Sequence, residues 1–133
     1  MKDLDHIGIA VADLEQAIDT YERLLDTECY KRETVEQQQV ETAFFQTGGS
    51  KVELLGATHS ESVIARYIAR KGEGMHHVAF EVDDIHAELK RLKAEGFTPL
   101  SEEPSRGADN KLVAFVHPRD SHGVLVELCQ SID

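Results

Sequence analysis

Basic residues are scarce in this sequence. Its 133 residues include 14 lysines and arginines against 25 aspartates and glutamates, a formal net charge of −11. Proteins that bind nucleic acids or anionic membranes present a concentrated basic surface. We therefore expect neither nucleic acid nor membrane as a partner, although the few basic residues can still gather around an anionic small molecule.

Long apolar runs and paired cysteines are also missing. No segment approaches the roughly 20 apolar residues that span a bilayer, and none resembles the apolar core of a signal peptide. Cys29 and Cys129 have neither the spacing of a disulfide framework nor that of a Cys-x-x-Cys motif. Since the first strand pattern begins near residue 4, we expect no targeting segment and a cytoplasmic protein, with a mature organellar protein as the alternative.

One stretch of the sequence occurs twice. Residues 4–11 read LDHIGIAV and residues 75–82 read MHHVAFEV. An offset of 71 positions places His6 on His77, and near the end of each copy an offset of 74 places Glu53 on Glu127. Because self-similarity at a fixed offset indicates a duplicated structural unit, we predict two tandem modules.

Each module is predicted to contain a strand, a helix and three further strands. In the first copy Asp13 caps a helix with an apolar stripe through Leu25, and Ser60 is expected to cap a connecting helix. In the second copy Asp84 opens the helix. The expected strands are 4–11, 28–33, 40–46 and 51–55, then 75–82, 97–100, 112–117 and 124–129, with a loop over 101–110.

This order predicts an α+β protein with two tandem βαβββ modules that form a curved mixed sheet around a metal site. We expect one domain over residues 1–133, with module one at 1–56, the connecting helix within 57–74 and module two at 75–133.

Two histidines and two glutamates occupy equivalent positions of the repeat. Glu53 and Glu127 each interrupt an apolar strand, and a buried carboxylate needs a partner or a cation. Taken singly, a strand histidine is more often a core residue and a strand glutamate more often an edge residue facing water. Their recurrence favours one shared divalent ion held by His6, Glu53, His77 and Glu127, a donor set that suits Zn, Co, Ni, Mn or Fe(II).

Strand alternation separates the two adjacent histidines of the second copy. His77 matches His6 in the repeat and shares a face with Ala79, whereas His76 shares one with Val78. We therefore expect His76 to be a packing or supporting group. The other histidines lie near turns, at a strand end or on a helix surface, and we leave them outside the metal site: His59, His86, His117 and His122.

These residues resemble the vicinal oxygen chelate superfamily of glyoxalases, bleomycin resistance proteins and dioxygenases. The strings most like its methylmalonyl-CoA epimerase family are DHIGIAV at 5–11, VELL at 52–55, GMHH at 74–77, SEEP at 101–104, HPR at 117–119 and GVLVEL at 123–128. The resemblance covers almost the whole chain. It implies an isomerase that interconverts (R)- and (S)-methylmalonyl-CoA by proton transfer at C2 through a metal-stabilised enolate.

The resemblance also implies particular roles and partners. It assigns the metal, Co, Zn, Mn or Ni, to the four ligands above, and names Glu127 as one acid/base group. It implies a second glutamate after the polar turn, for which Glu41 is the best match, an acyl-CoA substrate and a homodimer. Two segments depart from the family pattern, EQQQ at 36–39 and GADN at 107–110, and both bear on substrate fit.

Two other functions fit the same fold. A glyoxalase I-type lactoylglutathione lyase uses the same ligand types, but such enzymes usually carry Asp-Pro-Asp-Gly where this chain has His117-Pro118-Arg119. The chain also lacks a clear glutathione-binding arginine early in its first half. A non-catalytic binding module is the third possibility, and the complete set of four ligand types argues against it.

Overall fold

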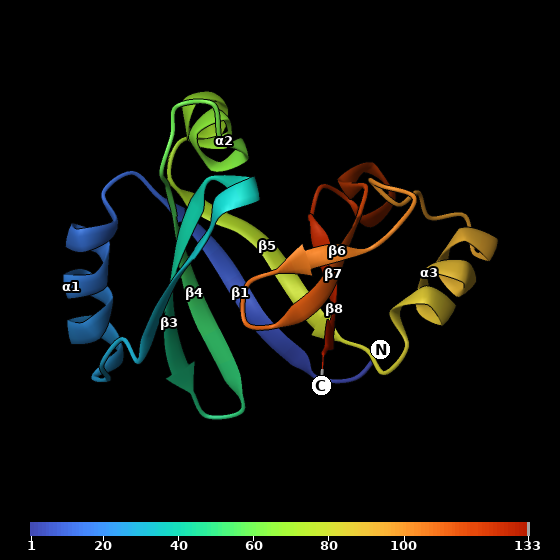
Figure 1. The fold of residues 1–133 in the computed structure, drawn as a ribbon, viewed down its shortest axis with the longest axis horizontal. Helices are drawn as coiled ribbons and strands as arrows, with labels where there is room; N and C mark the ends of the chain where they lie inside the picture. The colour runs from blue at the N-terminus through green and yellow to red at the C-terminus, as the bar shows by residue number, and fades with distance from the viewer. Residues whose placement is uncertain (133) are drawn as a thin grey trace. The chain divides into compact units, whose positions relative to one another are not determined.

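The computed structural model describes residues 1–132 and confirms the α+β class (Figure 1). The helices are α1 (Leu14–Leu25), α2 (Val63–Lys71) and α3 (Ile85–Ala94), with short 3₁₀ helices η1 (Glu36–Gln38) and η2 (Pro118–Ser121). The strands are β1 (Leu4–Val11), β2 (Lys31–Val35), β3 (Val40–Thr47), β4 (Ser50–Ala57), β5 (Gly74–Glu81), β6 (Ser105–Gly107), β7 (Lys111–Val116) and β8 (Val126–Ser131). Among the described residues, no helix is long and apolar enough to cross a bilayer.

The chain divides into two compact units whose boundaries differ from those of the sequence repeat. The N-terminal unit comprises Ile7–His76, and the C-terminal unit comprises Met1–His6 together with His77–Asp133. Strand β1 therefore passes from one unit to the other directly after His6, and β5 does so directly before His77. The first residues belong with the second half because the Lys2 N–H donates to the Glu81 carbonyl, and the Glu81 N–H donates to the Asp3 carbonyl.

In the N-terminal unit the strand order is β2-β3-β4-β1. Helix α1 covers one face of β3 and β4, where its apolar stripe packs against Ala43, Phe45 and Leu54. The approach is close, since a Cβ added at Gly56 would meet the Leu14 Cβ at 3.0 Å. A second cluster joins Ala10, Val40, Leu55 and Ile64, which brings α2 against the strands.

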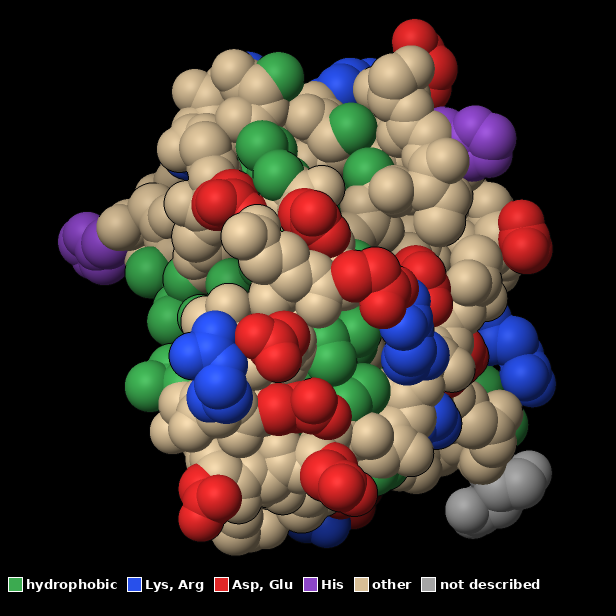
Figure 2. All heavy atoms as spheres, turned by 90° about the vertical axis from the view of Figure 1, so that its left-hand side faces the viewer, with side chains coloured by type: hydrophobic (Ala, Val, Ile, Leu, Met, Phe, Trp, Pro, Cys, Tyr) green, Lys and Arg blue, Asp and Glu red, His purple; other side chains and the backbone are tan. Residues whose placement is uncertain are grey.

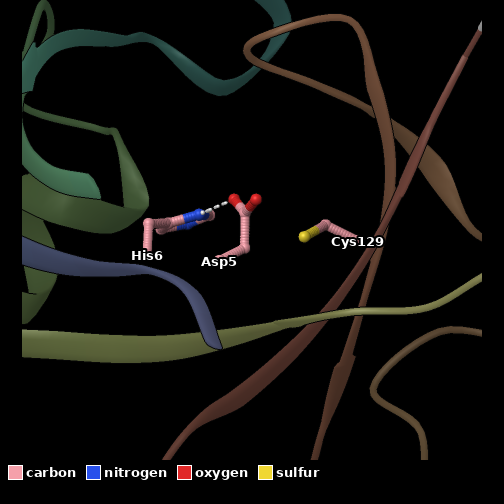
Figure 3. A group of neighbouring side chains, drawn as sticks. All are labelled: Asp5, His6 and Cys129. Atoms are coloured by element: carbon pink, nitrogen blue, oxygen red, sulfur yellow. Dashed lines mark hydrogen bonds and ion pairs between the residues drawn. The ribbon is translucent and has the colours of Figure 1, made fainter. Parts of the chain in front are cut away.

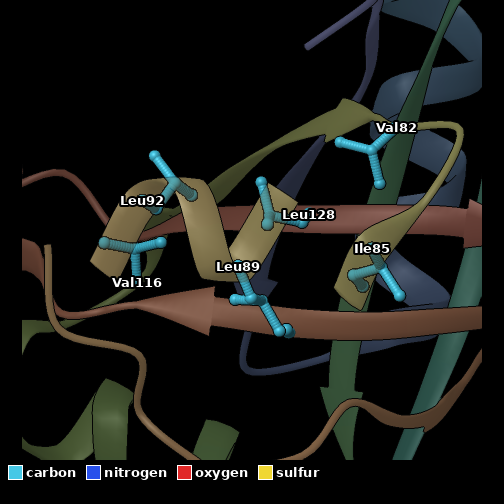
Figure 4. Close-up of a cluster of buried hydrophobic side chains, with 7 residues drawn as sticks. Val82, Ile85, Leu89, Leu92, Val116 and Leu128 are labelled. Atoms are coloured by element: carbon cyan, nitrogen blue, oxygen red, sulfur yellow. The ribbon is translucent and has the colours of Figure 1, made fainter. Parts of the chain in front are cut away.

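In the C-terminal unit the strand order is β5-β8-β7-β6, with β8 parallel to β5 and antiparallel to β7. Helix α3 buries Ile85, Leu89 and Leu92 against one face, where they meet Val116 and Leu128 (Figure 4). Burial of each such side chain contributes about 1.5–3 kcal/mol. The opposite face of β5, β8 and β7 carries His77 and Glu127, two of the predicted metal ligands described below.

Two of the three helices begin at the predicted capping residue, and the third begins later than predicted. Asp13 and Asp84 cap α1 and α3 as predicted, each accepting a backbone N–H from three residues on at 3.1 Å. The cap of α2 is Ser62 rather than Ser60, because the Ser62 hydroxyl accepts the Ala65 N–H at 3.0 Å. Residues before it form turns, so the helix begins later than predicted.

Two short strands also differ from prediction. The chain after α1 turns through Asp26 in a left-handed conformation, and β2 begins at Lys31 instead of residue 28. Residues 97–100 contribute only an isolated bridge between Pro99 and Val116, because the Thr98 N–H donates to the Asp120 carboxylate instead of continuing the ladder. The short strand of this module, β6, instead lies at Ser105–Gly107, inside the predicted loop.

Candidate metal centre

Three predicted ligands converge within the C-terminal unit. The Nε2 atoms of His6 and His77 lie 3.1 Å apart. Glu127 places Oε1 3.2 Å from the His77 Nε2 and Oε2 3.7 Å from the His6 Nε2. All three residues are buried, with exposed fractions of 5%, 6% and 5% for His6, His77 and Glu127. One ligand atom from each of the three residues lies within 4.8 Å of the other two.

Strand pairing explains why these side chains meet. On β5 and β8, Ala79 is the partner of Glu127, so the two side chains lie on the same face of the sheet. His77 is two residues from Ala79 and therefore shares that face. Phe115 of β7, the other partner of Glu127, contacts the edge of the His77 ring with centroids 5.8 Å apart. A one-residue slip of β8 would point Glu127 toward α3.

The donor set fits a divalent transition metal. Two imidazole nitrogens that each lie about 2.0–2.1 Å from one ion are about 2.8–3.0 Å apart at a right angle and about 3.3–3.4 Å apart at the tetrahedral angle, and the observed separation of 3.1 Å falls between these values. Nitrogen and carboxylate donors together suit Zn, Co, Mn, Ni or Fe(II). Three protein donors with further positions for substrate or water form the usual pattern of a catalytic site.

A fourth residue, Asp5, supports this group and was missed at the sequence level. Its Oδ2 lies 2.7 Å from the His6 Nδ1, while its Oδ1 lies 3.0 Å from the Lys111 Nζ. Strand alternation assigned Asp5 to the face opposite His6, yet Figure 3 shows its carboxylate turned to the His6 ring, with Cys129 nearby. Two signals were available: an acid directly before a candidate ligand, and a lysine beginning an apolar strand.

His76 behaves as predicted for a packing group. Its ring meets Tyr67 edge-on with centroids 4.8 Å apart, and the Tyr67 hydroxyl donates to the Met75 carbonyl at 2.9 Å. Both contacts lie within the N-terminal unit. The chain thus places the two adjacent histidines in different units and in different surroundings.

Glu53, the fourth predicted ligand, lies in the N-terminal unit and so outside the group formed within the C-terminal unit. It is 5% exposed and pairs with Phe44 across β3 and β4. It shares a face with Leu55, on the side of these strands away from α1. Its burial agrees with the sequence argument, while its role as a ligand stays a prediction.

Glu41, the predicted second base, lies on the other face of the same strands. Its partner across β4 is Gly56, which packs under α1. The Glu41 carboxylate accepts the Arg32 Nε–H at 2.9 Å, and Arg32 also donates to Glu15 of α1. The hydrogen bond with Glu15, followed by that with Glu41, raises the pKa of Arg32 above its ordinary range. The structure therefore does not bring Glu41 to the face that carries Glu53.

The acidic surface around α1 agrees with this local pairing. Figure 2 shows the side of the molecule on which α1 lies, with acidic side chains spread over it and basic side chains beside several of them. The hydrogen bond from Arg32 lowers the pKa of Glu15, so this carboxylate stays charged to a lower pH than an isolated glutamate. This surface is a set of solvated ion pairs, and it offers no concentrated basic patch.

The chain was compared with known protein families. The model of the Glyoxalase/Bleomycin resistance protein/Dioxygenase superfamily matches residues 5–115. This chain belongs to that superfamily. The resemblance inferred from the repeated histidines and glutamates is thereby confirmed at the level of the family.

Relatives within the superfamily are similar over nearly the full chain. The uncharacterized protein YqjC of Bacillus subtilis is 40% identical over 98% of this chain and 93% of its own length. The mitochondrial methylmalonyl-CoA epimerase of Homo sapiens is 40% identical over 96% of this chain and 73% of its own. A probable lactoylglutathione lyase of Vibrio cholerae is more distant, at 30% identity over 95% of this chain and 88% of its own.

A solved structure supports the same fold. The Streptomyces coelicolor methylmalonyl-CoA epimerase, as a variant in complex with 2-nitronate-propionyl-CoA, has a TM-score of 0.92 and 34% identity, covering 100% of this chain and 99% of that one. The predicted glyoxalase-like fold is confirmed by this match.

Proposed function

We propose that this chain is a metal-dependent isomerase that interconverts (R)- and (S)-methylmalonyl-CoA. The observation that carries the proposal is the convergence of His6, His77 and Glu127 in a chain about 40% identical to named epimerases over most of its length. The crystallised relative that binds an acyl-CoA analogue supports a CoA thioester as the substrate class.

The proposed metal site is built on the three converging residues, with Glu53 as the fourth ligand. Support for Glu53 comes from its equivalence to Glu127 in the repeat and from its burial. We propose one ion from the set Co, Zn, Mn or Ni. When bound, such an ion supplies a Lewis acid where negative charge develops on the substrate oxygens as the C2 proton leaves.

Glu127 is the proposed acid/base group. Its two oxygens face different histidines, so one oxygen is enough to bind a metal and the other remains available to a substrate proton. Burial keeps bulk water from competing for that proton, and a positioned acid/base group typically contributes 10²–10⁴-fold to rate. Phe115 packs at the edge of the His77 ring, which places that ring beside the Glu127 carboxylate.

Epimerisation needs a proton donor or acceptor on each face of the planar intermediate. The resemblance assigns the second role to Glu41, and this assignment remains a prediction. Its ion pair with Arg32 and its position on the α1 side of β3 give it no support. The proposal for the overall reaction does not depend on that one residue.

The assembly and location are proposed on the same resemblance. We propose a homodimer in the cytoplasm. Neither Cys29 nor Cys129 forms a disulfide in the described part of the chain, which suits a reducing compartment. Light scattering after gel filtration tests the first statement, and cell fractionation tests the second.

The reaction is tested by exchange in deuterated water. The metal-loaded protein is incubated with one epimer of methylmalonyl-CoA, and deuterium at C2 is followed by mass spectrometry, with the His6→Ala variant as control. We expect incorporation that requires added metal and is lost in the variant. If the protein incorporates no deuterium and instead isomerises the methylglyoxal–glutathione hemithioacetal, the lyase function replaces the epimerase function.

A further inference from the structure

A buried lysine, Lys111, contacts the carboxylate that binds His6, one of the proposed metal ligands. Lys111, at the start of β7, is 8% exposed, and its Nζ lies 3.0 Å from the Asp5 Oδ1. The side chains of both residues are 10% exposed. Lysine is among the residues least often buried, because removing its ammonium group from water is unfavourable unless a partner is held in good geometry.

The contacts continue from this ion pair to the metal group. The second oxygen of Asp5 lies 2.7 Å from the His6 Nδ1, a distance at which the ring N–H donates to the carboxylate. A neutral imidazole that donates through Nδ1 keeps its lone pair on Nε2. In His6 that atom is the one facing His77 and Glu127.

We propose that Lys111 is a positioning residue of the metal centre, acting through Asp5. A carboxylate beside a ligating histidine fixes the tautomer and the ring orientation of that histidine. Here the carboxylate could itself rotate about its side-chain bonds. Lys111 binds one oxygen, so the other is held toward His6. The inference rests on the proposed metal site and adds to it a residue that touches neither metal nor substrate.

The neighbouring thiol suggests a different use of the same atoms. Asp5, His6 and Cys129 also bring one donor atom each into a small group (Figure 3). A cation there would share Asp5 with the ammonium of Lys111, and like charges so close repel each other. The Cys129 thiol donates instead to the Phe80 carbonyl at 3.6 Å. Because Lys111 disfavours a cation at Asp5, we interpret Asp5 as a residue that orients His6 and not as a metal ligand.

The Lys111–Asp5 pair contacts His6, and the sequence does not repeat this pair beside His77. At the repeat offset of 71, Asp5 corresponds to His76 and Lys111 to Val40, an apolar core residue. The edge of the His77 ring contacts Phe115, with centroids 5.8 Å apart. The proposal therefore predicts that changes at Lys111 disturb the orientation of His6 more than that of His77.

The test compares Lys111→Met with Lys2→Met. Lys2 is a matched control, because its Nζ lies 3.0 Å from an Asp83 oxygen in the same unit, but it is exposed and contacts no histidine. Affinity for Zn²⁺ and Co²⁺ is measured by competition with a chelating dye. We expect Lys111→Met to weaken binding by roughly 10–100-fold, and Lys2→Met to bind as the wild type does.

A second measurement does not use metal at all. Proton–nitrogen correlation spectra of the metal-free protein, at a pH where the histidines are neutral, report the tautomer of each ring. We expect His6 to carry its proton on Nδ1 in the wild type and to lose this preference in Lys111→Met, with a smaller response at His77, whose Nε2 lies 3.1 Å from that of His6. Unchanged His6 signals together with unchanged affinity would overturn the proposal.

A double variant guards against misfolding. Asp5→Asn with Lys111→Met removes both charges at once, and we expect it to fold and to bind metal no more weakly than Asp5→Asn alone, since Lys111 acts on His6 only through Asp5. Fully additive losses contradict this path. Loss of Zn²⁺ binding in Cys129→Ser but not in His77→Ala would assign the metal to the thiol group. Absence of metal binding in the wild type would instead refute the proposed metal site itself.

Discussion

The two copies of the repeated strand share a histidine that is a predicted metal ligand, and they differ in the residues next to it. On β1, His6 is held at Nδ1 by Asp5, which is held in turn by Lys111. On β5, the residue before His77 is His76, which packs on Tyr67 in the other unit. The two copies thus share the predicted ligands, while the residues directly before them differ. We therefore expect removal of His6 or of His77 to lower metal affinity equally. Changes to the residues next to them should lower it unequally.

Removal of either histidine donor has the largest expected effect. His6→Ala and His77→Ala each delete one of the three converging donors, so both variants should lose metal more severely than the roughly 100-fold that loss of a supporting partner costs. Metal content after dialysis and C2 deuterium exchange measure this. If one variant keeps wild-type stoichiometry, the two copies do not contribute equally and the shared site is wrong.

Replacement of Glu53 comes next and tests whether the symmetry extends to the carboxylates. Glu53→Leu removes both donor oxygens at a position bordered by Phe44 and Leu55. We expect metal affinity to fall by about 10-fold or more, since an ion loses one of its charged ligands. Urea unfolding of the metal-free variant is the control. Lower stability with unchanged metal affinity would make Glu53 a structural residue.

The parts of this structure that the sequence predicted are those that the repeat specifies twice. The strand–helix order, the caps at Asp13 and Asp84, and the position of His77 rather than His76 beside His6 all follow from local patterns that recur at a fixed offset. The parts it missed occur once. Asp5 meets Lys111 across 106 positions of sequence, and no periodicity links them. The short strand β6 and the Ser62 cap depend on turn geometry that composition does not specify.

The helix caps provide a smaller, symmetric test. Asp13 and Asp84 accept equivalent backbone N–H groups at the same distance of 3.1 Å. Asp13→Ala and Asp84→Ala should therefore each lower the free energy of unfolding by about 1 kcal/mol. Urea denaturation measures both. The matched controls are Asp13→Asn and Asp84→Asn, which keep an accepting oxygen and should remain close to the wild type. A loss confined to one helix would show that the caps, like the residues before the two histidines, differ.

The smallest effect is expected at Glu41, where resemblance and geometry disagree. Glu41→Gln keeps the shape of the side chain and removes its charge, and the control Glu15→Gln removes the charge of the other acid bound to Arg32. Because Glu41 lies on the α1 side of β3, we expect the C2 exchange rate to stay within about twofold, against the 10²–10⁴-fold typical of an acid/base group. Exchange is measured separately from each epimer at saturating metal. A loss of 100-fold or more in Glu41→Gln alone, with metal content intact, would establish Glu41 as the second acid/base group. It would also require the N-terminal unit to rearrange this face during turnover, because the ion pair with Arg32 occupies the carboxylate in the structure described.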